Sequence, residues 1–517
     1  MLEFLLNLLI FLVVLSLVIC IHELGHLIFA KKAGILCHEF SFGMGPKVWA
    51  RKRGETTYMI KAVPFGGYVA MAGEEVEADV LKKGQKIRIG LDMDGEITKI
   101  VLNNNNLSYQ DFPEITVEDY DLLGKDGGKL FINEYFVKRN ALYVYERKVM
   151  QIAPFDRTFN AKTKWQRFMV AFAGPMMNFV LAIFVFLLMY LVSGVADPSS
   201  VVISKVDEDA PAYDILKDGD EIVAINGVDV FSWSEDNGQP SVVSELAKYE
   251  DYSYFVFTVI RNGEEITLDP IYPQYYFISL NIMNVPGNAA LEIFIPEDNE
   301  SSTDLRTGDI ITAIDGQTMT TWLDIINFQQ TYTEGTLDSA PTVITYLRNG
   351  VEHTYSFASY SEYELSSLGY PLFASKIGIT GSSVFNLLGI FEGTLASFVS
   401  ASTKIFSTLG LLFTSPRISV SDLTGFVGIY SITTSARESG FVSLLSWIGF
   451  LSVNLGIVNL LPIPALDGGR IVFIGYEAIA RRKPNQKFEN TLNTVMFFLL
   501  IALLIFVTYN DILRLIG

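Results

Sequence analysis

The feature that most constrains this chain is a pair of histidines placed inside its first hydrophobic segment. Residues 22–26 read HELGH and lie within an apolar run over residues 4–30. On an α-helix, positions i and i+4 share one face, so His22 and His26 can reach a single ion. Glu23 lies between them, near enough to polarise a metal-bound water. The spacing therefore indicates a zinc hydrolase centre with two histidine ligands and a carboxylate base.

The alternative is that the two histidines only satisfy each other inside a helical core. The chain has only four histidines, and two of them fall at this spacing around a glutamate. A charged residue in the middle of a membrane helix also costs about 2.5–3.5 kcal/mol on insertion scales. Both points favour a metal site inside the membrane, close to one surface.

Composition predicts a mixture of membrane helices and soluble domains. Half of the 517 residues are hydrophobic, and the net charge is −19. Residues 197–376 hold 7 Lys and Arg against 30 Asp and Glu, so an acidic block lies between apolar parts. Nucleic-acid binding needs a basic face, so we expect no nucleic-acid partner. The two cysteines, Cys20 and Cys37, offer no disulfide framework.

Basic residues beside the apolar segments predict the topology in the membrane. Lys and Arg cluster at residues 31–53, 162–167 and 481–483, and such clusters favour the cytoplasmic side. Residues 385–413 are apolar enough to cross, but a crossing there would place residues 481–483 outside. We therefore predict an interfacial amphipathic helix at 385–413. Four transmembrane helices result, at residues 4–30, 168–192, 441–463 and 492–509, with both ends and the acidic block outside.

Residues 37–75 are predicted to form a hairpin. Two strand-like runs flank a basic turn at residues 51–54, and glycines punctuate both runs. A plain cytosolic hairpin is one interpretation. The other is a hairpin that re-enters the membrane, where irregular backbone is tolerated only if protein buries it or it lines a wet cavity. Its unpaired edge could then hold an extended substrate by backbone hydrogen bonds, with Gly66, Gly67 and Tyr68 as candidate contacts.

The acidic block contains an internal repeat. Residues 219–227 read GDEIVAING and residues 308–316 read GDIITAIDG, and an RNG tripeptide follows each of them, at 261–263 and 348–350. This pattern predicts two tandem β-rich domains that resemble PDZ domains, which bind peptides by adding a strand to a sheet edge. Inert spacer domains are the alternative. The strand-rich residues 76–160 carry no catalytic pattern and are predicted to be a cytoplasmic insertion.

A third metal ligand is required, because catalytic zinc takes three protein ligands and a water. Residues 459–470 read NLLPIPALDGGR at the cytoplasmic end of the third predicted span. Asp467 is a carboxylate near the same membrane face, on a stretch that prolines and glycines keep from being regular helix. It is the best candidate, and a helix-capping aspartate is the alternative.

Together these motifs resemble the site-2 protease family of intramembrane zinc metalloproteases, of the bacterial RseP/RasP type. The resemblance runs through HELGH, FGMGP, KAVPFGGYVAMAGE, FDRTFNAKTKWQRFMVAFAGPMMNFVLA, the repeats and SVNLGIVNLLPIPALDGGR. It implies that His22, His26 and Asp467 bind zinc and that Glu23 is the base. It also implies that Asn459 engages the substrate backbone.

The resemblance further implies a substrate class and a location. Substrates would be single-span membrane proteins, such as anti-sigma factors in a stress response or signal-peptide remnants, cut first by a site-1 protease. The PDZ pair would reject substrates whose outer domain is untrimmed. The enzyme would lie in the lipid bilayer of the bacterial cytoplasmic membrane. A non-catalytic PDZ scaffold is the rival hypothesis, and a membrane-anchored protease of soluble peptides is a further one.

The predicted fold is a polytopic α-helical membrane protein with a re-entrant β-hairpin and two tandem extracytoplasmic PDZ domains. The predicted segments are a first transmembrane helix (1–36), the hairpin (37–75), the insertion (76–160), a second transmembrane helix (161–196), PDZ domain 1 (197–277), PDZ domain 2 (278–383), the interfacial helix and loop (384–440), and the third and fourth transmembrane helices (441–480 and 481–517).

Overall fold

The computed structural model describes most of the chain and divides it into two compact units. The first contains Met1–Val185 and Tyr430–Leu503, and the second contains Phe186–Ile429 and Leu504–Gly517. The described residues are 2–73, 81–102, 107–124, 128–145, 148–234, 238–248, 254–277, 280, 282–288, 290–295, 304–331, 342–357, 365, 373–414, 420 and 423–516. Glu74, Glu75 and the start of the predicted insertion lie outside them.

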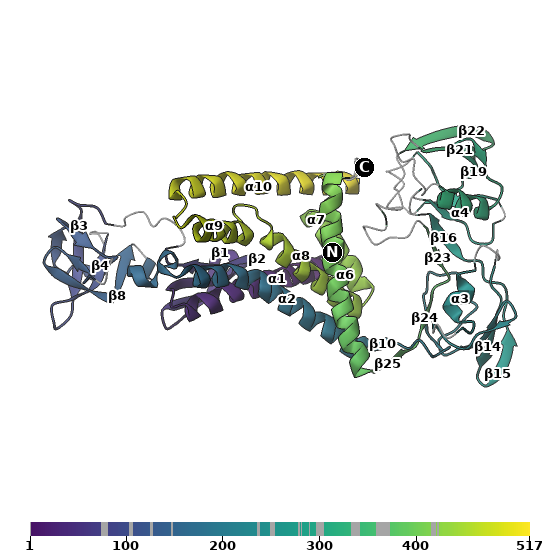
Figure 1. Cartoon of the computed structure of the whole chain (residues 1–517), viewed down its shortest axis with the longest axis horizontal. Coiled ribbons are helices and arrows are strands. Elements are labelled where there is room, and N and C mark those ends of the chain that lie inside the picture. The colour runs from purple at the N-terminus through teal and green to yellow at the C-terminus, as the bar shows by residue number, and fades with distance from the viewer. Residues whose placement is uncertain are drawn as a thin grey trace. The chain divides into compact units, whose positions relative to one another are not determined.

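Five described helices are long and apolar enough to cross a membrane (Figure 1). They are α1 (Leu2–Lys32), α2 (Lys164–Ser193), α6 (Leu387–Thr414), α8 (Phe441–Leu460) and α10 (Gln486–Ile516). Two further helices are α7 (Phe426–Glu438) and α9 (Asp467–Ala480). The least apolar of the five is α6, yet it meets the same length and composition criteria. The four-span topology and the interfacial placement of residues 385–413 therefore stay predictions.

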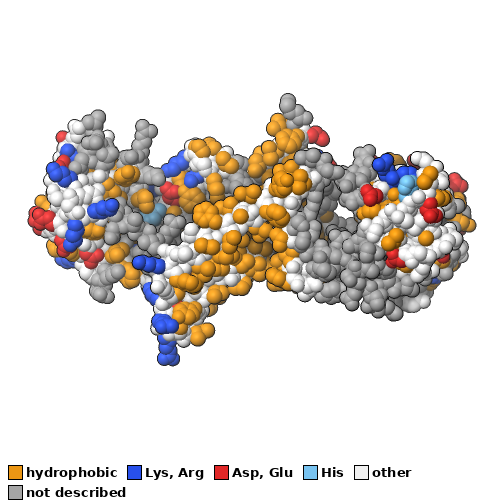
Figure 2. All heavy atoms as spheres, turned by 90° about the horizontal axis from the view of Figure 1, so that it is seen from above, with side chains coloured by type: hydrophobic (Ala, Val, Ile, Leu, Met, Phe, Trp, Pro, Cys, Tyr) orange, Lys and Arg blue, Asp and Glu red, His pale blue; other side chains and the backbone are white. Residues whose placement is uncertain are grey.

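Many side chains on these helices are apolar and exposed. Figure 2 shows apolar side chains covering a broad continuous area of the surface. Leu9 on α1, Phe184 on α2, and Phe498 and Ile505 on α10 are each more than half exposed. A water-soluble monomer rarely exposes so large an apolar surface, whereas a helix in lipid does so by necessity. Membrane-type helices therefore make up much of this protein.

The hairpin consists of β1 (Cys37–Arg53) and β2 (Thr56–Met71). Both strands are longer than the sequence pattern predicts, and both fold back on themselves. As a result, residues 39–42 pair with residues 57–60 on one side and with residues 67–70 on the other. Residues 49–53 then pair with 56–60, so the hairpin forms a small four-segment sheet in which residues 67–70 make one edge.

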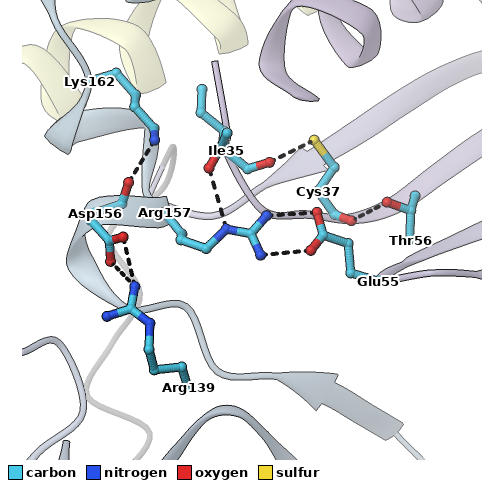
Figure 3. Close-up of polar contacts among 9 residues, drawn as sticks. Ile35, Cys37, Glu55, Thr56, Arg139, Asp156, Arg157 and Lys162 are labelled. Atoms are coloured by element: carbon cyan, nitrogen blue, oxygen red, sulfur yellow. Dashed lines mark hydrogen bonds and ion pairs between the residues drawn. The ribbon is translucent and has the colours of Figure 1, made fainter. Parts of the chain in front are cut away.

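The end of the hairpin that holds the predicted turn is tied to the segment before α2. Arg157 donates two hydrogen bonds of 2.8 Å to the two carboxylate oxygens of Glu55, as Figure 3 shows. Thr56 donates to the carbonyl of Cys37 at 2.7 Å in the same view. The bonds of Arg157 fix this end of the hairpin to the short 3-10 helix Phe155–Arg157, and a second 3-10 helix, Phe159–Ala161, follows it.

Residues 81–151 form a seven-stranded sheet with its own core of isoleucines, which includes Ile87, Ile89, Ile97, Ile100 and Ile132. The strand order is β5-β3-β4-β8-β7-β6, and β9 pairs with β8. The strands are β3 (Lys86–Leu91), β4 (Ile97–Val101), β5 (Glu114–Thr116), β6 (Tyr120–Asp121), β7 (Phe131–Ile132), β8 (Tyr135–Tyr145) and β9 (Lys148–Gln151), with a 3-10 helix at Leu107–Tyr109.

The sequence repeat in the acidic block corresponds to two four-stranded sheets of the same order. The first sheet is β13 (Val228–Asp229), β12 (Glu221–Ile225), β14 (Phe257–Arg261) and β15 (Glu264–Thr267), with helix α3 (Val242–Leu246). The second is β20 (Gln317–Thr318), β19 (Ile310–Ile314), β21 (Thr342–Arg348) and β22 (Val351–Phe357), with helix α4 (Trp322–Thr331). Asn262 and Asn349 take positive φ in the two tight turns, as Asn-Gly hairpins require.

Each of these four-stranded sheets, together with its helix, is called a β unit below. After the second β unit, the chain returns to the first. A third sheet consists of β18 (Ile293–Phe294), β17 (Ile282–Asn284), β16 (Gln274–Phe277) and β23 (Phe373–Lys376). It shares a hydrophobic core with the second β unit. Strand β24 (Ile379–Gly381) then pairs with β11 (Ile203–Val206), and β25 (Ser383–Val384) pairs with β10 (Val195–Ala196). Ile377 packs into the core of the first β unit. Residues 377–381 therefore lie with the first β unit. The predicted domain boundaries stay predictions.

Candidate metal centre

The HELGH segment lies on α1 and places both histidines on one buried face. His22 is 7% exposed and His26 is 6% exposed. The residues around them are apolar, so helix formation needs no local signal beyond the long hydrophobic run, and Lys31 and Lys32 end it. The Nε2 atoms of His22 and His26 lie 3.1 Å apart. The i, i+4 geometry expected from the sequence is therefore present.

Asp467 is the first residue of α9 and comes to the same point from the far end of the chain. The segment between α8 and α9 leaves helical geometry, and Ala465 takes a positive φ of 74°. A side chain at Gly468 would collide with the carbonyls of Leu460 and Leu461, so this glycine lets the chain fold tightly back before α9. The tight fold presents the Asp467 carboxylate, 8% exposed, to the histidines.

The three side chains converge on one small volume. Asp467 Oδ2 lies 3.1 Å from His22 Nε2 and 3.3 Å from His26 Nε2. Tetrahedral bonds of about 2.0–2.1 Å to zinc place ligand atoms roughly 3.3 Å from each other. The observed separations fit that geometry. Within the described residues, this is the only group of three histidine, cysteine or carboxylate side chains close enough to share an ion.

Helix α2 supports the histidines from behind, at residues spaced four apart. His26 Nδ1 lies 2.8 Å from the carbonyl oxygen of Val170, and His22 Nδ1 lies 3.3 Å from Asn178 Nδ2. Between them stands Gly174, where a Cβ atom would overlap both imidazole rings. The sequence analysis did not find these contacts. A glycine and an asparagine four residues apart in an otherwise apolar helix are the signal that could have indicated them.

The predicted catalytic and substrate residues lie in different surroundings. A Cβ atom at Gly67 would lie 3.5 Å from Glu23 Cγ, so the hairpin edge runs close to the predicted base. Gly66 is buried next to it. The Tyr68 hydroxyl instead donates to Glu39 and accepts from Lys61 at 2.9 Å, which ties the hairpin's own strands together. Asn459 is half-buried in the last turn of α8.

An ion pair fixes the helix that carries Asp467. Arg167 on α2 donates to Glu477 on α9 at 2.6 Å, and both side chains are about one-tenth exposed. Glu477 lies on the same helix as Asp467, ten residues further along. Because α2 also supports both histidines, this pair links the third candidate ligand to the other two. Sequence analysis missed it, since the partners are 310 residues apart.

Comparison with known proteins places the whole chain in one family. The sequence profile of Peptidase family M50 matches residues 10–503. Zinc metalloprotease RasP of Shouchella clausii is 33% identical over 98% of this chain and 99% of its own length. The protein of that name from Geobacillus kaustophilus is 32% identical over 99% of each chain, and that from Oceanobacillus iheyensis 31% over 98% of each. The predicted family, enzyme class and zinc cofactor are therefore confirmed: this chain belongs to peptidase family M50, the site-2 type of zinc metalloprotease.

Proposed function

We propose that this protein hydrolyses peptide bonds in or beside the transmembrane segment of single-span membrane proteins, with zinc held by His22, His26 and Asp467. The observation that carries the proposal is the convergence of these three side chains, 3.1–3.3 Å apart. Both histidines lie on α1, which is long and apolar enough to cross a membrane. The rings are buried and held by α2, so little reorganisation is needed to form a ligand set.

Glu23 is the proposed general base. Bound zinc would acidify a water molecule and polarise the scissile carbonyl. Glu23 takes the proton from the attacking water and passes it to the amine nitrogen that leaves. Its place on α1, one residue after His22 and next to the hairpin edge at Gly67, supports this role.

The edge at residues 67–70 is the proposed cradle for the substrate. An intact helix shields its carbonyls, so the substrate must unwind before it reacts. An extended segment can then pair with residues 67–70, which pair with residues 39–42 on their other side. Asn459 would offer its amide to the substrate backbone. Poor helix formers near the cleavage point should therefore assist cleavage.

The two β units are proposed to be extracytoplasmic PDZ domains of a four-span protein in the bacterial cytoplasmic membrane. Their matched sheets, each with a helix at the same place in the repeat, support a PDZ-like role. They would exclude substrates whose outer domain has not been trimmed by a first protease. Anti-sigma factors and signal-peptide remnants are the proposed substrates.

The test uses purified protein in liposomes with a tagged single-span substrate. Glu23→Gln keeps the shape and removes the base, so cleavage should fall by about 10²–10⁴-fold while zinc stays bound. A chelator should stop wild-type cleavage and added zinc should restore it. Equal cleavage by Glu23→Gln would refute the assignment and reopen the scaffold hypothesis.

A second arm of this assay addresses the filter. Replacing residues 198–381 by a short Gly-Ser turn keeps β10 paired with β25, because Ala196 already faces Ser383. The shortened protein should cut a substrate that retains its outer domain, which the full chain rejects. Unchanged rejection by the shortened protein would remove the filter proposal.

A further inference from the structure

Asn178 is buried, and the oxygen of its side-chain amide, Oδ1, has no hydrogen-bond partner among the described residues. The residue is 0% exposed. Its Nδ2 atom lies 3.3 Å from His22 Nδ1. A buried amide oxygen without a partner costs free energy, on the order of 1–3 kcal/mol. A buried polar atom left in this way beside a candidate metal ligand calls for an explanation.

The chemistry of histidine ligation decides which atom of the Asn178 amide should face His22. A neutral imidazole carries its proton on one nitrogen and its lone pair on the other. His22 Nε2 is the atom that faces His26 Nε2 and Asp467 Oδ2, so ligation there requires the lone pair on Nε2 and the proton on Nδ1. The Nδ1–H group then needs an acceptor. The oxygen and nitrogen of an amide are nearly equal in size, so turning the Asn178 amide by 180° presents Oδ1 to this N–H group without repacking and places Nδ2 where Oδ1 lay.

We propose that Asn178 is a positioning residue for the zinc centre, whose Oδ1 accepts the Nδ1–H of His22 and so fixes the ring and the tautomer that bind metal. The inference rests on the proposed ligand role of His22. It gives the two histidines matched supports on one face of α2: the carbonyl of Val170 for His26, and the side chain of Asn178 for His22. Only the second support is a side chain, so only it can be removed by substitution.

The position of Asn178 is itself fixed by the neighbouring helix. Ser452 on α8 donates to the Asn178 backbone carbonyl at 2.8 Å, and this contact does not involve the amide. Ser452→Ala therefore serves as a matched control, since it alters the same helix junction and leaves the bond to His22 intact. Outer partners of ligating histidines typically contribute 10–100-fold to metal affinity.

The experiment measures zinc affinity of the full-length protein in detergent by competition with a chromophoric chelator. We expect Asn178→Leu to weaken zinc binding by about 10–100-fold, and Asn178→Asp, which keeps an acceptor oxygen, to stay within a few-fold of wild type. Ser452→Ala should bind zinc like wild type. The absorption spectrum of the cobalt-loaded protein should change in Asn178→Leu and not in Ser452→Ala.

The outcomes separate this inference from the proposed function. If His22→Ala binds zinc like wild type, the ligand assignment is wrong. If His22→Ala loses zinc while Asn178→Leu keeps wild-type affinity, only the positioning role is overturned. An equal loss in Asn178→Leu and Asn178→Asp would also overturn it, because packing rather than the acceptor would then matter. Should the leucine variant not fold, Asn178→Ala replaces it, with the same expectations.

Discussion

The metal centre and the two β units are built in opposite ways. The centre draws on residues near 22, 170 and 467, and apart from the contact of His22 with His26 on α1, its contacts join helices far apart in the chain. Each β unit instead forms the same ion pair inside its own repeat: Arg261 pairs with Asp220, and Arg348 pairs with Asp309, at 2.6 and 2.7 Å. Each β unit is thus stabilised by contacts within its own repeat, whereas the metal centre depends on how whole helices are placed.

The largest effect on stability and zinc binding should come from breaking the buried ion pair between α2 and α9. Glu477→Gln leaves Arg167 charged and buried at about one-tenth exposure, and breaking such a pair typically costs about 3–5 kcal/mol. We expect lower thermal stability together with weaker zinc binding, because α9 carries Asp467. The double variant Arg167→Glu, Glu477→Arg should recover part of both losses. Melting and zinc titration of the full chain would show this.

A surface pair provides the control for that prediction. Lys83 and Asp119 lie 2.8 Å apart, and both side chains are about two-thirds exposed. Exposed pairs contribute roughly 0–1 kcal/mol, so Asp119→Asn should leave melting and zinc affinity unchanged. Equal effects of Glu477→Gln and Asp119→Asn would show that the pair between α2 and α9 does not hold the centre together.

A smaller effect, on catalysis alone, is expected from a substitution at the hairpin edge beside Glu23. A Cβ atom at Gly67 would lie 2.8 Å from the Ser41 carbonyl oxygen, so Gly67→Val should displace the edge from Glu23. Misplacement of about 1 Å near a reacting centre can cost on the order of 10²-fold, so kcat/KM should fall while zinc affinity holds. Gly475→Ala on α9, where a Cβ atom meets nothing within 4 Å, is the control. A Gly67→Val enzyme as active as Gly475→Ala would exclude the edge as a substrate cradle.

How much of the structure could be predicted from the sequence depends on how far apart the interacting residues lie in the chain. The spacing of His22 and His26 is local, so it could be predicted, and Asp467 was found because zinc needs a third ligand. Val170, Asn178 and the Arg167–Glu477 pair act across helices, and no local pattern specifies which faces meet. The β repeat was visible for the same reason as HELGH, whereas the return of residues 377–381 to the first β unit depends on long-range strand pairing.

The smallest effects should appear in the two β units, and they should match. Asp220 and Asp309 are 1% exposed, and each accepts from the arginine of its RNG turn. Asp220→Asn and Asp309→Asn should each destabilise their own sheet by about 1–3 kcal/mol and leave zinc binding unchanged. Hydrogen exchange of β12 and β19 in the full chain would measure this. A loss of zinc affinity in either variant would break the contrast between the two regions.

Acid should weaken the first β unit in a defined window. Burial alone would raise the pKa of Asp220, but the hydrogen bond and charge of Arg261 outweigh it and hold that pKa below its ordinary value. A carboxylate with a lowered pKa stabilises the fold above its unfolded pKa of about 3.9, and this contribution is lost as pH falls towards the folded pKa. Protection of β12 should therefore be constant above about pH 5 and decline below about pH 4. Asp220→Asn should abolish that decline, and a decline that persists in the variant would assign it to another group.

The short pairing of β10 with β25 has a consequence for the chain's length. Val195 faces Val384, so the long excursion between them leaves and returns at one point. The entropy of closing a loop rises only with the logarithm of its length, by about 0.6 kcal/mol per doubling. The free energy of bringing together the two helices that flank the β10–β25 pair therefore depends little on the length of chain between β10 and β25. Domains of different size can be inserted between β10 and β25 without a change in how the helices pack.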